Sequence, residues 1–312
     1  MQHSIPEISV VTPVFNEEEV VRTFCDRMST VLDRMSLPYE LIFVDDGSRD
    51  RSFELLQQIH DEQPGVVRVV RLARNFGHQL AITAGLRHAR GRAVIVLDCD
   101  LQDPPELVPS FVERWREGYE VVYGRRSARK GETWFKRFTA GIFYWILDHV
   151  ASVRIPRDVG DFYLLDRKVV DVLGSMEERH RFIRGLVAWV GFRRVAVDYV
   201  REPRFAGVTK YGLFRMIQFS LDALTAFSFA PLRFISLCGA GISFLSFLGI
   251  LWVFILKIVN PAVVLGWSSL MVAVLFIGGI QLLAIGLIGE YLARIGDDVK
   301  HRPLYTIQDV LE

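Results

Sequence analysis

The sequence predicts an α/β fold with a largely parallel sheet, followed by two long apolar helices. Up to about residue 230, short apolar runs rich in β-branched residues alternate with amphipathic helical patterns. Polar residues gather where these runs end, as at the carboxyl ends of strands in such sheets. Two later stretches carry no charge and exceed the roughly 20 residues that cross a bilayer.

The elements of the first part follow from the periodicity of its apolar residues. Apolar runs predict strands at 8–14, 40–44, 66–72, 93–97 and 119–123. Helical spacing predicts helices at 17–35, 52–62, 77–90 and 105–117. Asn16 is expected to cap the first helix, and Pro104-Pro105 to end a strand and open the last helix.

Residues 234–256 and 258–289 contain no Asp, Glu, Lys, Arg or His. They predict transmembrane helices at about 233–257 and 265–290, with Asn260-Pro261 at the turn of a hairpin. The alternative, a pair of buried core helices, would be unusual at this length.

Basic residues flank this hairpin at both of its outer ends. Arg233 precedes it, and Arg294, Lys300 and Arg302 follow it. The positive-inside rule therefore predicts a multi-pass protein of the inner (cytoplasmic) membrane with both termini in the cytosol. We expect a cytosolic domain at 1–230, the hairpin at 231–292 and a cytosolic tail at 293–312.

Composition bears on the partners, the cellular compartment and the targeting of the chain. The 37 basic and 36 acidic residues nearly cancel, so the net charge says little about partners, and no nucleic-acid partner is expected. The three cysteines lack CxxC pairing and metal-ligand spacing, which suits a reducing compartment without disulfides. The polar residues Gln2 to Glu7, followed by only a short strand-like run, predict no signal peptide.

Four predicted strands end in polar residues that could share one site. These are Asn16-Glu17, Asp45-Asp46, Arg74-Asn75 and Asp98-Cys99-Asp100. Neither GxGxxG nor GxxxxGK[ST] is present, so a bound diphosphate would need another partner. A divalent cation on Asp98 and Asp100 would serve, and carboxylate oxygens suit Mg²⁺ or Mn²⁺.

Six blocks in order carry a resemblance to a known family. PVFNEEE, VDDGSRDRS, RNFGHQLAITAGL, LDCDLQDPPE, YGRR and DVGDFYLLD resemble family 2 glycosyltransferases with a GT-A fold. More narrowly, the chain resembles bacterial bactoprenol glucosyltransferases and, more distantly, dolichol-phosphate mannose synthases. The resemblance implies inverting, metal-dependent transfer of a hexose, with glucose expected, from a UDP-sugar to polyprenyl (undecaprenyl) phosphate.

The resemblance also assigns the donor site. It implies that Pro13, Phe15, Glu17 and Asp45 hold the base and ribose of the nucleotide sugar. The other members of the expected donor site are Asp46, Asn75, Asp98 and Lys210. An Asx turn is the alternative for Asp45 and Asp46. Lys210 belongs to a loop at 204–211 expected to close over the diphosphate, with a simple linker as the alternative.

The acceptor side is predicted from the DVGD block and from the basic residues after the YG pair. Asp158 or Asp161 is the expected catalytic carboxylate beside Asp100, although a lipid phosphate is already an anion and needs little deprotonation. A structural role for Asp158 and Asp161 stays open, as does a choice between helix capping and site support for Gln102 and Asp103.

Arg125, Arg126 and Arg137 are expected to bind the acceptor phosphate. Amphipathic helices predicted at about 133–147 and 213–229 would lie in the membrane interface, with core helices as the alternative. The four histidines His78, His88, His149 and His180 show no shared spacing and are interpreted as ordinary.

The alternatives are transfer of another sugar, a polysaccharide synthase, and a protein without catalytic activity. Mannose, galactose or an amino sugar could replace glucose. A processive polysaccharide synthase would carry QxxRW, which the segment around Arg184 and Trp189 does not supply. A nucleotide-sugar sensor or scaffold would not need the acidic pair and the basic cluster together. A homotetramer, a separate flippase and a downstream glycosyltransferase are expected partners.

Overall fold

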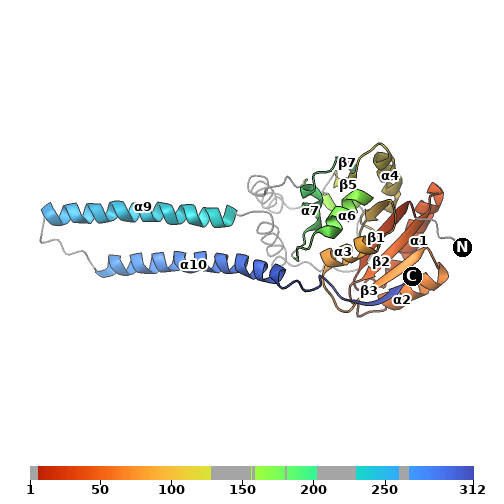
Figure 1. Ribbon diagram of the computed structural model, residues 1–312, viewed down its shortest axis with the longest axis horizontal. Coiled ribbons are helices and arrows are strands. Elements are labelled where there is room, and N and C mark those ends of the chain that lie inside the picture. The colour runs from red at the N-terminus through yellow and green to blue at the C-terminus, as the bar shows by residue number, and fades with distance from the viewer. Residues whose placement is uncertain (1–5, 128–155, 157–158, 180, 202–229, 260–266) are drawn as a thin grey trace.

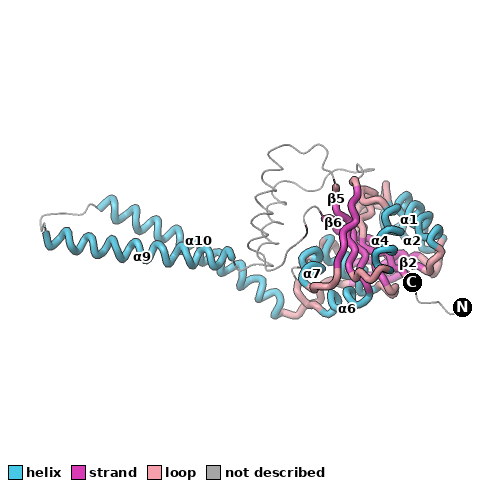
Figure 2. Tube along the Cα trace, turned by 90° about the horizontal axis from the view of Figure 1, so that it is seen from above, coloured by secondary structure: helices cyan, strands magenta, loops and turns pink. Residues whose placement is uncertain are grey.

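The computed structural model describes residues 6–127, 156, 159–179, 181–201, 230–259 and 267–312. They form a sheet domain and two long helices, α9 (Ala230–Val259) and α10 (Trp267–Val299), which run side by side away from it (Figures 1 and 2). The predicted α/β class with a central sheet is confirmed.

The sheet has eight strands in the order β7-β5-β6-β4-β1-β2-β3-β8. Their bounds are β1 Ile8–Val14, β2 Tyr39–Asp45, β3 Val67–Leu72, β4 Ala93–Val96, β5 Val121–Arg126, β6 Val159–Asp166, β7 Arg194–Tyr199 and β8 Ile307–Leu311. Strands β1 to β4 are parallel, as predicted. The sheet is mixed beyond them, because β6 runs antiparallel to β4 and β5, and β8 runs antiparallel to β3.

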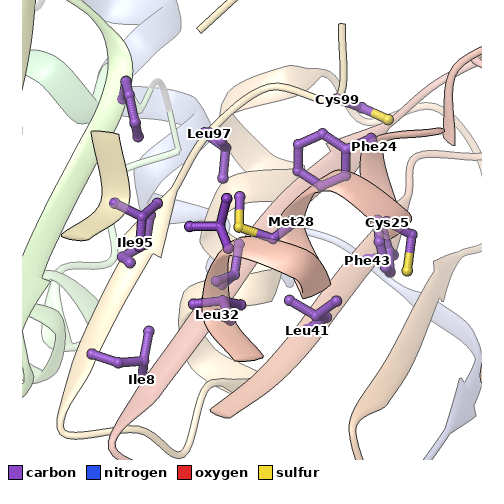
Figure 3. Close-up of a cluster of buried hydrophobic side chains, with 14 of the residues drawn as sticks. Ile8, Phe24, Cys25, Met28, Leu32, Leu41, Phe43, Ile95, Leu97 and Cys99 are labelled. Carbon is purple, nitrogen blue, oxygen red and sulfur yellow. The ribbon is translucent and has the colours of Figure 1, made fainter. Parts of the chain in front are cut away.

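Helices cover both faces of the sheet, each over its own buried core. One core includes α1 (Val21–Met35), α2 (Ser52–Glu62), the 3₁₀ turn η1 (Pro105–Leu107) and α4 (Val108–Arg116). The other includes α3 (His78–His88), α6 (Arg167–Ser175) and α7 (Ile183–Trp189). Figure 3 shows Phe24, Met28 and Leu32 of α1 packed among the strand residues of the first core.

Helix α1 begins later than the sequence pattern indicates. Asn16, the expected cap, has φ 54°, and its side-chain Oδ1 accepts a hydrogen bond from Arg49 N at 2.8 Å. The helix starts at Val21, after a turn in which Glu17 O accepts from Val20 N and Val21 N. Asn16 is therefore occupied by the neighbouring loop, so the prediction that it caps the helix is wrong.

Helices α9 and α10 lie where the two apolar stretches predict them. Within the described residues, Phe276–Val299 is long and apolar enough to cross a membrane, and Ile235–Gly249 is a shorter apolar segment. Large apolar side chains on both helices are exposed, among them Phe244, Trp252, Phe276 and Leu282. The two-span hairpin stays a prediction.

The residues expected to form a C-terminal tail include a strand. Helix α10 continues to Val299, and β8 then pairs with β3 from Val69↔Leu311 to Leu72↔Ile307. The chain therefore returns from the end of α10 to the sheet of the first domain.

Candidate active site

One edge of the sheet collects the polar residues that follow the strands. The carboxyl ends of β1 to β5 and β7 lie at this edge, and the antiparallel β6 brings its amino end there. Asp45 is the last residue of β2, and Asp161 lies near the start of β6. Glu17 and Asp98 lie in the loops that follow β1 and β4. The sheet order thus brings together residues that are up to 144 positions apart in the sequence.

The loops after β1 and β2 are joined by hydrogen bonds. Ser48 Oγ accepts from Asn16 N at 3.0 Å, and Ser52 Oγ accepts from Glu17 N at 2.8 Å. Pro13 is buried in β1, whereas Phe15 and Glu17 are partly exposed. The backbone beside the predicted nucleotide site is therefore held in place before any ligand binds.

Asp45 and Asp46 are both buried, but their contacts differ. The Asp46 carboxylate accepts from Phe76 N at 2.7 Å and Gly77 N at 2.9 Å, so it orders the loop that leads into α3. Asp45 Oδ1 accepts from Ser48 N at 3.1 Å, while Asp45 Oδ2 is buried without a hydrogen-bond partner. Burial raises the pKa of both carboxyls. Asp45 is thus the one of the two whose carboxylate has an oxygen that no hydrogen bond satisfies.

Gly47 explains how the loop after β2 meets the loop after β3. Its φ is +69°, and a Cβ there would lie 2.6 Å from the backbone carbon of Arg74 and 2.7 Å from Asn75 N. A side chain would push these loops apart. Asn75 is exposed on the far loop.

Asp98 and Asp100 follow β4 with Cys99 between them. Cys99 belongs to the buried core cluster, where burial raises the pKa of its thiol well above the ordinary value, so it is a packing residue (Figure 3). The Asp98 side chain is 31% exposed, but its Oδ1 is buried and has no hydrogen bond. Burial raises the pKa of Asp98 to about 6. Asp100 Oδ1 accepts from Gln102 N at 3.1 Å.

The acidic pair fits a divalent cation that also has substrate ligands. The described residues contain no group of three His, Cys, Asp or Glu side chains suited to a metal ion. Mg²⁺ and Mn²⁺ sites often need only one or two carboxylates, because water and substrate phosphates complete the coordination. Asp98 Oδ1 has no hydrogen bond, and a carboxylate oxygen is the kind of ligand that such an ion binds.

The Asp161 carboxylate accepts hydrogen bonds from side chains of α3 and α7. Its Oδ1 accepts from Arg184 Nε at 2.9 Å, and its Oδ2 accepts from His78 Nε2 at 3.1 Å and from Gln79 Nε2 at 3.2 Å. Burial would raise the pKa of Asp161, but Arg184 and His78 hold it well below its usual range. These contacts favour a positioning role for Asp161 and make it a weak base.

His78 connects the two halves of this edge. Its Nε2 lies 3.1 Å from Asp161 Oδ2 and 3.5 Å from Asp98 Oδ1. Burial lowers the pKa of His78, but the two carboxylates outweigh burial and raise it to about 9. His78 is therefore an imidazolium at neutral pH, which reduces the repulsion between Asp98 and Asp161.

A second cluster surrounds Asp103, which is fully buried. Its Oδ1 accepts a hydrogen bond from Tyr199 Oη, and Tyr199 Oη in turn accepts one from Arg126 Nε at 3.2 Å. Arg126 Nη2 and Arg201 Nε each lie 3.8 Å from Asp103 Oδ1. Two guanidinium groups thus share one carboxylate, which leaves the cluster with net positive charge.

Arg125 and Arg126 point to different faces of β5, as neighbours in a strand do. Arg125 forms a bidentate, exposed pair with Asp198, with Arg125 Nε at 2.5 Å from Asp198 Oδ1 and Nη2 at 2.8 Å from Oδ2. Arg126 faces Asp103 and is 21% exposed. Of the two predicted phosphate ligands in β5, Arg126 is the one placed beside the acidic residues of the site.

Several predictions lie outside the described residues. These are Asp158, Arg137, Lys210, the loop at 204–211 and the amphipathic helices at 133–147 and 213–229.

The fold brings to this edge several residues that the sequence patterns do not mark as functional. His78 was interpreted as ordinary, and no role was assigned to Gln79, Arg184, Tyr199 or Arg201. His78 and Gln79 lie within the RNFGHQLAITAGL block, so their position in a matching block was an available signal. Tyr199 is brought to the site by its hydrogen bond to Asp103, which is 96 residues away, so no local sequence pattern marks it.

Comparison with known proteins gives a consistent picture. The model of the glycosyl transferase family 2 matches residues 9–174. The glycosyltransferase YkcC of Bacillus subtilis is 49% identical over 302 residues, which cover 97% of this chain and 93% of the relative. The bactoprenol glucosyl transferase of Shigella phage SfV is 39% identical, with 97% of this chain and 98% of the relative covered.

One solved structure is similar to this chain. The glucosyl-3-phosphoglycerate synthase of Mycobacterium tuberculosis, crystallised with phosphoglyceric acid, is 22% identical with a TM-score of 0.48. The match covers 70% of this chain and 79% of that one.

Proposed function

Because this chain belongs to glycosyl transferase family 2, we propose that it transfers a hexose from a UDP-sugar to polyprenyl phosphate at the cytosolic face of the inner membrane. Glucose is the expected sugar, since relatives that match nearly the whole chain are named bactoprenol glucosyl transferases. The product is a β-linked polyprenyl-phosphate sugar.

The observation that carries the proposal is the arrangement of charge along one sheet edge. Asp45 and the pair Asp98 and Asp100 occupy the side of β2, β1 and β4. The cationic cluster of Arg126 and Arg201 occupies the side of β5 and β7. A nucleotide sugar held by the first group would face an anionic acceptor held by the second.

Each group has a defined part in the reaction. Asp45 accepts hydrogen bonds from the base or ribose, with Pro13, Phe15, Glu17 and Asn75 around it. Asp98 and Asp100 would hold Mg²⁺ or Mn²⁺ against the diphosphate, and a bound cation stabilises the charge that develops on the leaving UDP. Asp46 orders the loop before α3 through Phe76 and Gly77.

The acceptor phosphate supplies its own nucleophile. A phosphate oxygen attacks the anomeric carbon, the bond from that carbon to the UDP oxygen breaks, and UDP leaves with the bonding electrons. A monoester phosphate has its second pKa near 6, so its oxygen is an anion at pH 7 and positioning matters more than a general base. Arg126, with Arg137 and Lys210 as further predicted cations, would hold the two anionic substrates.

The two long helices support placement at a membrane. Helices of 30 and 33 residues span about 45–50 Å, more than the roughly 30 Å hydrocarbon core. Their exposed apolar side chains need an apolar environment. A multi-pass arrangement with cytosolic termini, a homotetramer, a separate flippase and a downstream glycosyltransferase stay predictions.

Turnover tests the proposal. The full chain in detergent, given labelled UDP-glucose and undecaprenyl phosphate, should yield a chloroform-soluble labelled product that is lost when chelator is added. Asp100→Asn should abolish transfer without unfolding the protein, whereas Glu62→Gln, which alters only the exposed pair with Arg22, should not. Label that stays aqueous, or a long polymer, would contradict the proposal. A panel of nucleotide sugars identifies the sugar.

A further inference from the structure

Arg71 lies between two carboxylates that belong to different strands. The sheet register pairs Arg71 with Asp45 of β2 on one side and with Asp309 of β8 on the other. Arg71 Nε is 3.6 Å from Asp45 Oδ2, and Arg71 Nη1 is 3.8 Å from Asp309 Oδ2. The guanidinium also lies 4.0 Å over the ring of Phe53. Both carboxylate distances exceed hydrogen-bond length.

This intermediate position leaves Asp45 Oδ2 buried without a hydrogen bond. A buried polar atom without a partner costs free energy, and such atoms in native proteins commonly have a functional reason. If Arg71 moved closer by less than 1 Å, it would satisfy this oxygen. The attraction of Asp309 opposes that movement.

A second row of charges on the opposite face of the sheet gives a contrast. Arg68 Nη1 donates to Glu40 Oε2 at 2.9 Å, and Arg68 Nη2 donates to Glu312 Oε1 at 2.7 Å. Both contacts are at hydrogen-bond length, and the Arg68 and Glu40 side chains are about 95% buried. This row attaches the end of β8 to the sheet and has no contact with Asp45 among those the structure describes.

We propose that Asp309 is a positioning residue for the donor nucleotide, because it keeps Arg71 from closing on Asp45 and so leaves Asp45 Oδ2 to accept a hydrogen bond from a nucleoside diphosphate. The inference rests on the proposed function, in which Asp45 binds the base or ribose. Since β8 follows α10 in the chain, the row Asp45–Arg71–Asp309 also connects the end of the α9–α10 pair to the donor site.

UDP binding to the full chain in nanodiscs with Mg²⁺, measured by titration calorimetry, tests this inference. Asp309→Asn removes the charge that draws Arg71 toward β8 and keeps the side-chain shape. The Kd for UDP should rise about fivefold, which corresponds to one hydrogen bond weakened by about 1 kcal/mol. The kcat at saturating donor should stay unchanged, because Asp309 affects binding only.

Two variants separate positioning from mere attachment of the strand. Glu312→Gln makes the same chemical change on the same strand, but in the Arg68 row, and should leave the Kd within twofold of wild type. Asp309→Glu keeps the charge and should retain most of the affinity. An equal loss in Asp309→Asn and Glu312→Gln, or no loss in Asp309→Asn, would overturn the inference.

Asp45→Asn distinguishes this inference from the proposed function on which it rests. If UDP affinity does not depend on Asp45, the donor-site assignment itself is wrong, and the role of Asp309 is wrong with it. If UDP affinity depends on Asp45 but not on Asp309, only the inference about Arg71 and β8 is wrong.

Discussion

At the scale of single residues, Gly160 shows how one missing side chain shapes the site. A Cβ at this position would lie 2.5 Å from Arg126 Nη2 and 3.6 Å from Asp103 Oδ2. The glycine therefore makes room for a guanidinium beside a buried carboxylate, at the edge where we place the acceptor phosphate. Because the clash involves the far end of a flexible side chain, a larger residue would move Arg126 before it disturbed the backbone.

Gly160→Ala should accordingly impair acceptor binding in a folded protein. Displacing Arg126 removes a charge-assisted hydrogen bond to the phosphate, so the KM for polyprenyl phosphate should rise about tenfold, with the KM for the UDP-sugar little changed. Steady-state kinetics with each substrate varied in turn measure this effect. Gly174→Ala, where a Cβ meets nothing within 4 Å, is the matched control. An unchanged acceptor KM would remove Arg126 from the acceptor site.

At the scale of elements, Asp161 is the point at which β6, α3 and α7 meet. It lies in β6, and it accepts hydrogen bonds from His78 and Gln79 of α3 and from Arg184 of α7. Gln79 also binds α7, because its Oε1 accepts from Ile183 N at 2.7 Å. Helices α3 and α7, two of the helices over this face of the sheet, are thus joined through one buried anion.

Asp161→Asn should destabilise the protein by about 3 kcal/mol, because it removes the buried charge that Asp161 places beside the partly buried Arg184 and His78. Chemical unfolding of the ligand-free protein, followed by tryptophan fluorescence, measures the free energy of unfolding. Asp198→Asn breaks an exposed pair instead and should change the unfolding midpoint little. A midpoint for Asp161→Asn equal to that of wild type would show that these contacts do not hold the helices.

At the scale of the whole molecule, strand β8 constrains how the chain can lie in a membrane. The chain leaves the sheet domain before α9 and rejoins the same sheet at β8 after α10. A strand that pairs with β3 must be on the same side of the bilayer as β3. If α9 and α10 span the membrane, they therefore span it as a pair, which agrees with the positive-inside argument from Arg294, Lys300 and Arg302.

Cysteine labelling in whole cells tests this topology. With the native cysteines replaced by serine, a cysteine placed in the segment 260–266 should react with a membrane-impermeant maleimide. A cysteine at the exposed Gln308 should react only after the cells are permeabilised. Labelling of both positions in intact cells would contradict a paired crossing.

Much of the fold was predictable, because local patterns carry the necessary information. The β-branched runs predicted β1 to β5, and helical spacing predicted α1 to α4 to within a few residues. The antiparallel strands β6 and β8 were not predicted, nor was β7. In particular, β8 is an exposed edge strand in which Ile307, Gln308, Asp309 and Val310 are all exposed, so no buried run or face marked it.

For the candidate site, the sequence by itself determined which residue types stand at the strand ends: the acidic pair at Asp98 and Asp100, the adjacent Asp45 and Asp46, and the basic pair in β5. Only the tertiary structure decided what each of them contacts. It distinguished Asp45, which has a buried oxygen without a hydrogen bond, from Asp46, which binds a loop. It also distinguished Arg126, which faces Asp103, from Arg125, which pairs with Asp198. The physical reason is that a carboxylate or guanidinium acts through the charges that surround it, and here those charges come from strands and helices far apart in the sequence.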